Sequence, residues 1–142
     1  MPFLLRVRAE PADIDSLGHV SNLVYLRWVL EAALAHSTAK GLDEAAYKAR
    51  GQGWVVRRHE IDYVRAALAG DELVVETRVA TVAAASSTRR TRILREGELL
   101  ARAATNWAYV DFRTGRPMRI PDDVKSLFEV EPDEPDQDRA TR

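Results

Sequence analysis

The residues with the greatest chemical potential lie together between positions 13 and 25. This stretch reads Asp13-Ile14-Asp15-Ser16-Leu17-Gly18-His19-Val20-Ser21-Asn22, with Tyr25 three residues further on, directly ahead of an apolar run. If a helix begins at Asn22, its first backbone N–H groups lack partners and present about half a unit of positive charge. Those groups can polarise a carbonyl oxygen while a nearby carboxylate attacks the carbon or deprotonates an attacking water. The pattern favours acyl transfer, with thioesters as the most suitable target because their carbonyl is more electrophilic than that of an ester or amide.

Other catalytic patterns are missing from the sequence. There is no G-x-S-x-G elbow, no Walker A loop and no H-E-x-x-H segment, which argues against serine hydrolases, nucleoside triphosphatases and zinc proteases. The chain has no cysteine, so disulfides and thiolate chemistry are excluded and a reducing cytoplasm is the expected location. No pair among the three histidines has ligand spacing, so we expect neither a metal nor an organic cofactor.

Composition indicates one domain followed by a tail. The chain has 142 residues, of which 46% are hydrophobic and 30% charged, as in a single soluble domain. Arg6 and Arg8 interrupt the N-terminal apolar run, which excludes a signal peptide or membrane span there. Residues 129–142 hold six acids and two arginines, so the body, 1–128, carries +3 against the chain's net −1. This mild charge predicts no nucleic-acid partner, and we expect the acidic tail to be disordered.

The elements that must position the polar stretch follow from periodicity and turn residues. A strand is predicted at 3–9, a loop at 10–18, a mostly buried helix from Asn22 to about Lys40 and a short helix at 43–50. Four long strands at 54–68, 71–82, 86–96 and 99–112 and a helical turn at 121–128 complete the chain. Short connections imply antiparallel neighbours. The economical architecture is α+β, a strongly curved five-stranded antiparallel sheet wrapped around a long central helix.

These residues also resemble a known family. The motif Asp13-x-Asp15-x-x-Gly18-His19-Val20-x-Asn22-x-x-Tyr25, followed by Arg27 and Glu31, is similar to that of hotdog-fold acyl-coenzyme A thioesterases of the 4-hydroxybenzoyl-coenzyme A thioesterase group. Ile61-Asp62-Tyr63, Gly70-Asp71 and the segment from Asp111-x-x-Thr114-Gly115-Arg116 to Ile120-Pro121 add to the resemblance. It covers the chain from Phe3 to about Phe128 and predicts a hotdog fold over residues 1–128.

The resemblance implies an activity and an assembly. It predicts hydrolysis of a small or medium acyl-coenzyme A to the free acid and coenzyme A, with Asp15 as nucleophile or general base and the amide at Asn22 polarising the carbonyl. Asp13 would be an accessory residue. Members of this group form homodimers in which two sheets join edge to edge with the active sites at the interface, and dimers often pair into homotetramers. Surface arginines and lysines usually hold the phosphates of coenzyme A.

Each remaining candidate has a structural alternative. His19 could bind substrate or orient Asp15, or its role could be to satisfy loop backbone groups. Tyr25 lies one helical turn beyond Asn22 and could contact the acyl group, or it could be a core tyrosine. Asp13 could instead satisfy loop amides. For the phosphates we favour Arg89 and Arg90 over Arg57 and Arg58, although neighbouring strand residues point to opposite faces, so each doublet offers one arginine to a face.

Two other functions remain open at this stage. A non-catalytic hotdog module could bind an acyl thioester or an acyl carrier protein without hydrolysing it, and a panel of acyl-coenzyme A substrates with a thiol-trapping dye separates this from catalysis. Hydration of an enoyl thioester would keep the fold and change the reaction. The motif for that reaction sets aspartate and histidine further apart and adds an acid after the histidine, which this stretch lacks.

Overall fold

The computed structural model describes residues 1–133. Its helices and strands follow one another in the order β1 (Phe3–Arg8), η1 (Pro11–Asp13), α1 (Asn22–Ala39), α2 (Glu44–Arg50), β2 (Gln52–Tyr63), β3 (Glu72–Val82), β4 (Ser86–Arg95), β5 (Glu98–Asp111) and α3 (Asp122–Lys125). No helix within residues 1–133 is both long and apolar enough to cross a membrane.

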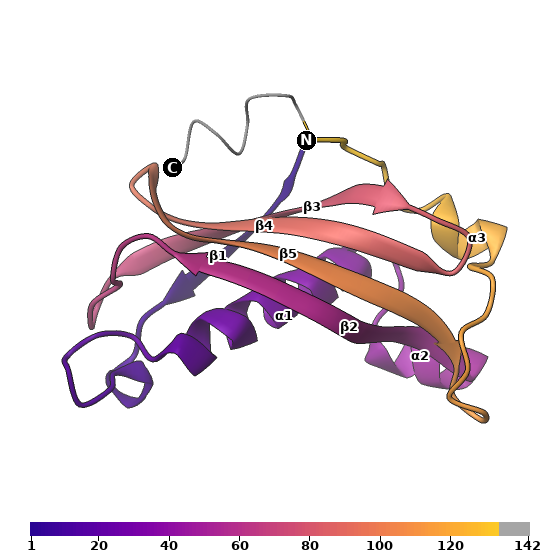
Figure 1. Ribbon diagram of the computed structural model, residues 1–142, viewed down its shortest axis with the longest axis horizontal. Helices are drawn as coiled ribbons and strands as arrows, with labels where there is room; N and C mark the ends of the chain where they lie inside the picture. Colours follow the sequence, from indigo (N-terminus) through magenta and orange to yellow (C-terminus); the bar gives the residue numbers. More distant parts are fainter. Residues whose placement is uncertain (134–142) are drawn as a thin grey trace.

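The strands form one antiparallel sheet with the order β1-β3-β4-β5-β2 (Figure 1). The tight connections β3–β4 and β4–β5 make sequence neighbours into sheet neighbours, as short turns require. The segment containing α1 and α2 separates β1 from β2 in the sequence, and these two strands form the opposite edges of the sheet. The long strand β2 pairs only with β5 among the described strands, so its other edge is open.

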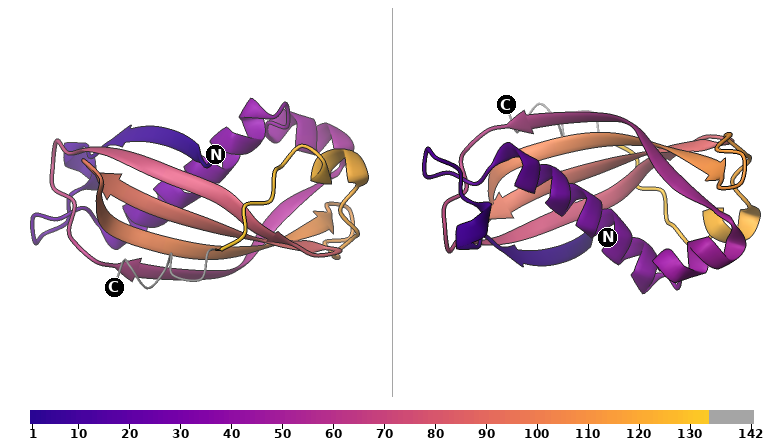
Figure 2. Two further views of the ribbon diagram at one scale, coloured as in Figure 1. Left: turned by 90° about the horizontal axis from the view of Figure 1, so that it is seen from above. Right: turned by 90° about the horizontal axis from the view of Figure 1, so that it is seen from below.

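Helix α1 crosses the inner face of the curved sheet, and α2 continues beside the start of β2 (Figure 2). Trp28, Val29 and Ala32 of α1 are buried against inner-face residues such as Leu73 and Ile93. Alternation explains the choice of face, because every second residue of β3 and β4 points inward. The predicted five-stranded sheet around a central helix is confirmed.

The end of β2 differs from the prediction. We expected this strand to continue to Leu68, but it ends at Tyr63. The N–H groups of Val64 and Arg65 both donate to the carbonyl of Leu100, and the N–H of Ala67 donates to the hydroxyl of Tyr25 on α1. The apolar residues beyond Tyr63 satisfy a strand pattern, yet the chain leaves the sheet because a helix side chain takes over one of its backbone hydrogen bonds.

The start of the acidic tail is placed on the outer face of the sheet. Val130 forms a parallel bridge with Val79 of β3, and the carboxylate of Asp133 pairs with Arg78 and Arg90. Asp133 thus meets a complementary surface formed by arginines of β3 and β4, and disorder of the tail stays a prediction. The rest of the tail, 134–142, lies outside the described residues.

Candidate active site

The chain between η1 and α1 forms a tight turn closed by backbone pairing. Ile14 and Val20 form an antiparallel bridge, and the N–H of Asp15 donates to the carbonyl of His19 at 2.8 Å. The N–H of Gly18 returns to the carbonyl of Asp15 at 3.1 Å, with Gly18 at φ +82°. A left-handed residue is needed at this point, which explains the glycine of the motif. The turn thus has a defined shape although most of it is exposed.

Asp15 uses one carboxylate oxygen to hold this turn. Its Oδ1 accepts the N–H groups of Leu17 at 2.9 Å and His19 at 3.2 Å. Its Oδ2 makes no hydrogen bond with any residue of the described chain, and the side chain is exposed. The turn therefore fixes the carboxylate through one oxygen and leaves the other available for a substrate or water.

The N-terminus of α1 directly follows this turn. Ser21 caps the helix by accepting the N–H of Leu23 on its Oγ at 3.3 Å. The backbone N–H of Asn22 has no acceptor within residues 1–133, as expected for a first-turn amide. The hydroxyl of Tyr63, at the end of β2, donates to the carbonyl of Asn22 at 3.4 Å. An exposed carboxylate and an unpaired helix N–H thus lie in one short segment.

Asp13 is placed differently from Asp15, although only one residue separates them. It is 5% exposed. Its Oδ2 accepts the N–H of Glu10 at 2.9 Å, and its Oδ1 accepts from Nη2 of Arg27 at 3.1 Å. Arg27 also pairs with Glu31, as the spacing predicts. Both oxygens of Asp13 are therefore occupied in fixing the turn to α1, which favours the structural alternative for this residue.

His19 is exposed, whereas Tyr25 is buried. The imidazole of His19 is exposed and makes no hydrogen bond to the described chain, so it is free to meet a ligand. Tyr25 is buried, its hydroxyl accepts the N–H of Ala67 at 2.8 Å, and its ring packs edge-on against Trp28 and Tyr63. Burial raises the pKa of the Tyr25 hydroxyl. Tyr25 therefore lies in the core beneath the turn.

Arg89 and Arg90 are not brought together. Arg90 lies on the outer face of the sheet and pairs with Asp133. Arg89 points to the inner face, where it is 7% exposed. The alternation foreseen for neighbouring strand residues is confirmed. Arg90 stays a predicted phosphate ligand, whereas Arg89 is in no position to act with it on one surface.

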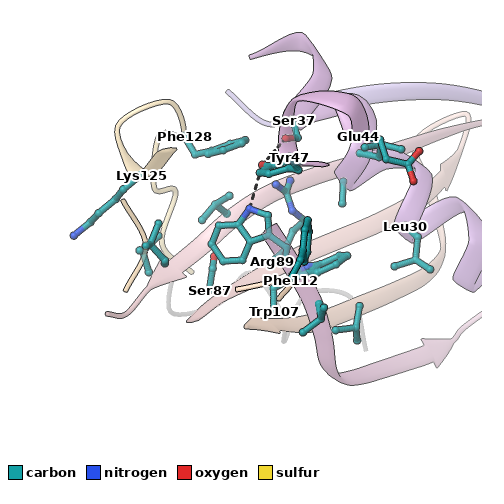
Figure 3. A pocket seen from close by; sticks show the side chains of 18 of the residues that line it. Leu30, Ser37, Glu44, Tyr47, Ser87, Arg89, Trp107, Phe112, Lys125 and Phe128 are labelled. Carbon is teal, nitrogen blue, oxygen red and sulfur yellow. Dashed lines mark hydrogen bonds between the residues drawn. The ribbon is translucent and has the colours of Figure 1, made fainter. Parts of the chain in front are cut away.

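A large cavity lies beside the second half of α1, away from the acidic turn. It has a volume of about 660 Å³ and lies between α1, α2 and the inner face of the sheet (Figure 3). Its walls include Leu30, Leu34 and Trp107, and Arg89 also lines it. None of the residues 13–25 lines this cavity. Within one copy of the chain, the turn and the cavity are therefore separate features. Within residues 1–133, no group of three His, Asp or Glu side chains is placed to hold a metal ion.

Sequence reasoning missed two aspects of this arrangement. Tyr63 was noted only as part of the family resemblance, and its contact with Asn22 depends on a strand end more than 40 residues away in sequence. The cavity lined by Arg89 also had no sequence signal, because a strand arginine is usually solvated. The three consecutive inward positions Ser87, Arg89 and Thr91 were the available hint, since they place polar residues on a face predicted to be packed.

A curved antiparallel sheet wrapped on one long helix, with an acid-bearing turn at the helix N-terminus, defines the class of hotdog thioesterases. Comparison with known proteins identifies the family. The sequence pattern of the thioesterase-like superfamily matches residues 9–128. The chain belongs to this superfamily, so it is an enzyme of the thioesterase class, and the resemblance noted from its motif is confirmed.

Individual relatives agree with this assignment. The chain is 30% identical over 127 residues to the acyl-CoA thioesterase YbgC of Haemophilus influenzae, covering 89% of this chain and 93% of that protein. A hypothetical protein from Thermus thermophilus is 27% identical with a TM-score of 0.82, over 88% of this chain and 95% of its own. A 1,4-dihydroxy-2-naphthoyl-CoA thioesterase from Synechocystis, 21% identical over 89% of this chain and 95% of its own, shares the fold with a TM-score of 0.82.

Proposed function

We propose that this protein hydrolyses small or medium acyl-CoA thioesters and that Asp15 is the catalytic carboxylate, acting as nucleophile or general base. The observation that carries the proposal is the Asp15 carboxylate, which is held through Oδ1 while Oδ2 has no partner in the described chain. The unpaired N–H of Asn22 follows in the same segment. The similarity to a protein named as an acyl-CoA thioesterase supports coenzyme A as the carrier.

Two routes use this geometry. As a general base, the Asp15 carboxylate takes a proton from water, the hydroxide oxygen bonds to the acyl carbon, and the C–S bond then breaks. As a nucleophile, a carboxylate oxygen bonds to the acyl carbon, the thiolate leaves, and water hydrolyses the resulting anhydride. In both routes the carbonyl oxygen gains negative charge, which the Asn22 N–H and the α1 N-terminus stabilise. His19 is the nearest candidate in sequence to hold the substrate or orient Asp15.

The working unit of this proposal is a homodimer, and a pair of such dimers is the tetramer that the family resemblance implies. The open edge strand β2 exposes Val55 and Val56, and α1 exposes Leu23 and Leu34, of which Leu34 lines the same cavity as the two valines. An open strand edge with apolar neighbours favours pairing with another strand. A two-fold axis perpendicular to this edge would pair the two β2 strands antiparallel and direct the acidic turn of one protomer toward the cavity beside the second half of α1 in the other. Sedimentation equilibrium of the full chain measures this state, and a monomer would contradict it.

Activity is tested with a panel of acyl-CoA thioesters and a thiol-trapping dye, comparing wild type with Asp15→Asn. The asparagine Oδ1 can still accept both turn N–H groups, so the variant removes the charge and keeps the turn. We expect kcat/KM to fall by about 10²–10⁴-fold, the usual contribution of a general base. The matched control is Asp111→Asn, because Oδ1 of Asp111 accepts the N–H of Arg113 in a similar exposed turn.

The control should retain wild-type turnover. Near-normal turnover by Asp15→Asn would contradict the role of Asp15. Absence of hydrolysis of every thioester by wild type, together with retained binding, would favour the non-catalytic module instead. The location of the protein in the cytoplasm stays a prediction from its lack of cysteine.

A further inference from the structure

The cavity beside the second half of α1 contains a buried arginine without a carboxylate partner. Arg89 is 7% exposed. Its Nη1 approaches Nδ1 of His36 at 2.9 Å and Oγ1 of Thr77 at 3.2 Å. Within residues 1–133 no carboxylate lies within ion-pair distance of Arg89, whereas Arg78, Arg92 and Arg95 on the same two strands each pair with one. Arg89 is thus an exception among its neighbours.

Neither partner of Arg89 supplies negative charge. Burial, with the charges of Arg89 and Lys40, lowers the pKa of His36 to about 4, so its ring is neutral at neutral pH. The Nδ1 atom of the neutral ring can accept a hydrogen bond from Nη1 of Arg89. Burial lowers the pKa of Arg89 to about 10, which still leaves the guanidinium charged. A buried charge without an opposite charge is costly. An anion that entered the cavity would remove much of this cost.

A second N–H donor without a partner belongs to another residue that lines the cavity. Nε1 of Trp107 is buried and has no hydrogen-bond partner in the described chain, and Trp107 lines the cavity. Trp107 lies opposite Ser87 in the β4–β5 ladder, and Arg89 lies opposite Thr105, so Trp107 and Arg89 are diagonal neighbours on one face. Diagonal neighbours are within reach of long side chains. Two residues whose N–H donors lack an adequate acceptor therefore line one cavity.

The remaining walls indicate what else the ligand must be. Most of the lining is aliphatic or aromatic, including Leu30, Leu34, Val79 and Phe112, and Figure 3 shows Phe112, Trp107 and Arg89 among the side chains around the cavity. The other charged lining residues are Glu44, Lys48 and Lys125, so the lining carries net positive charge when Arg89 is included. A volume of about 660 Å³ is in the range of sites for ligands of drug size. The chemistry fits an apolar molecule that ends in an anion.

We propose that this cavity binds an apolar chain that ends in a carboxylate, with Arg89 as the ion-pair partner and the Trp107 N–H as a second donor. Such a carboxylate has two sources. It is either a free carboxylic acid or the far-end carboxylate of an acyl chain whose other end is a thioester. Binding itself does not depend on hydrolysis, and only the second source rests on the function proposed above.

The first experiment needs no variant. Isothermal titration calorimetry of the wild-type chain compares decanoate, decanol and decylamine, which share an apolar chain and differ in the end group. We expect decanoate to bind at least about tenfold more tightly than decanol, the scale of a charge-assisted hydrogen bond, and decylamine to bind more weakly than both. Equal affinities for the three compounds would overturn the proposal.

Variants then locate the effect. Arg89→Met keeps much of the side-chain volume and should remove the preference for decanoate over decanol. The matched control is Arg92→Met, three residues further along β4 on the outer face, where Arg92 pairs with Glu76; it should keep the preference. If Arg89→Met fails to fold by circular dichroism, Trp107→Phe decides, since it removes the indole N–H while keeping an aromatic ring and should weaken decanoate binding severalfold more than decanol binding. An unchanged preference in the folded variant would overturn the role of Arg89.

A final comparison separates the two sources. Hydrolysis of decanoyl-CoA is compared with that of the mono-CoA thioester of decanedioic acid. A kcat/KM about tenfold higher for the second substrate in wild type, lost in Arg89→Met, assigns the cavity to the far end of an acyl group. No such preference, together with tight decanoate binding, assigns it to a free acid. If neither thioester is hydrolysed, the proposed function fails while the calorimetric result still stands.

Discussion

The two ends of α1 present charged groups in opposite ways. At its N-terminus the carboxylate of Asp15 is exposed, fixed by two backbone N–H groups and left with one oxygen unoccupied. Beside its C-terminal half, the guanidinium of Arg89 is buried, touches only neutral partners and faces an apolar cavity. Both groups are held by the fold, but only the first meets water.

The difference separates two kinds of site. An exposed charge with a fixed geometry costs little free energy of folding and is ready to react with a group that approaches from solvent. A buried charge without a counter-charge costs more, and that cost is recovered only when a ligand of opposite charge binds. We therefore assign reaction chemistry to the turn and ligand selection to the cavity.

The largest expected effect tests whether the two ends act separately. In Asp15→Asn, turnover of acyl-CoA should fall by about 10²-fold or more, whereas the affinity for decanoate should change by less than about twofold, because no residue of the turn lines the cavity. Enzyme assays and calorimetry on the same preparation measure both quantities.

A loss of decanoate binding in Asp15→Asn would contradict this separation within the chain. Because the proposed dimer directs the turn of one protomer toward the cavity of the other, the titration should be carried out above and below the concentration at which the protein dissociates. If Asp15→Asn weakened decanoate binding only in the dimer, the turn of one protomer would contribute to the cavity of the other across the interface.

The next effect compares Asp13 with Asp15 in stability. Asp13 uses both oxygens, so in Asp13→Asn either the N–H of Glu10 or the guanidinium of Arg27 faces an amide donor. We expect the free energy of unfolding to fall by about 1–3 kcal/mol, the cost of a buried donor without an acceptor. Asp15→Asn should change it by less than about 0.5 kcal/mol, as for most exposed substitutions. Urea unfolding of the two variants measures the contrast, and equal losses would contradict it.

The structure around the N-terminus of α1 could be predicted from the sequence, because it depends on residues that are close to one another along the chain. The helix start, the glycine at positive φ and the capping of α1 by Ser21 all depend on residues within one short segment. The sequence also offered two aspartates with similar surroundings. The two aspartates differ in their hydrogen bonds, because the guanidinium of Arg27 on α1 and the N–H of Glu10 occupy both carboxylate oxygens of Asp13.

The cavity end could not be predicted in the same way, because Arg89 is buried only by elements distant in sequence. His36 reaches it from α1 and Thr77 from β3, over separations of 53 and 12 residues. Alternation predicts that Arg89 and Arg90 point to opposite faces, but it does not say which arginine is buried. The same limit applies to Ala67, whose backbone pairs with Tyr25 where a strand was predicted.

The smallest effect concerns His36 and the pH dependence of stability. Phe3 stacks on its ring and Phe128 packs edge-on against it, and the charged groups acting on it are Arg89, Lys40 and Glu131. Burial first and then Arg89 lower its pKa from 6.5 to about 4 in the folded chain. The unfolded chain therefore binds a proton on this residue between these two pH values while the folded chain does not.

Stability from this group is consequently complete above about pH 6.5 and is lost as the pH falls toward 4. Between pH 7 and pH 5 we expect wild type to lose on the order of 1 kcal/mol more unfolding free energy than His36→Asn. The asparagine Oδ1 can accept the Arg89 N–H as Nδ1 does but takes up no proton, so the two proteins differ in slope even if the variant is less stable throughout. Urea titrations at several pH values give both slopes. Parallel curves would mean that His36 has the same pKa in the folded and the unfolded chain, which would contradict this prediction. If decanoate bound beside Arg89, its charge would favour the protonated ring and reduce the difference in slope, so repeating the titrations with decanoate connects this histidine to the ligand proposed for the cavity.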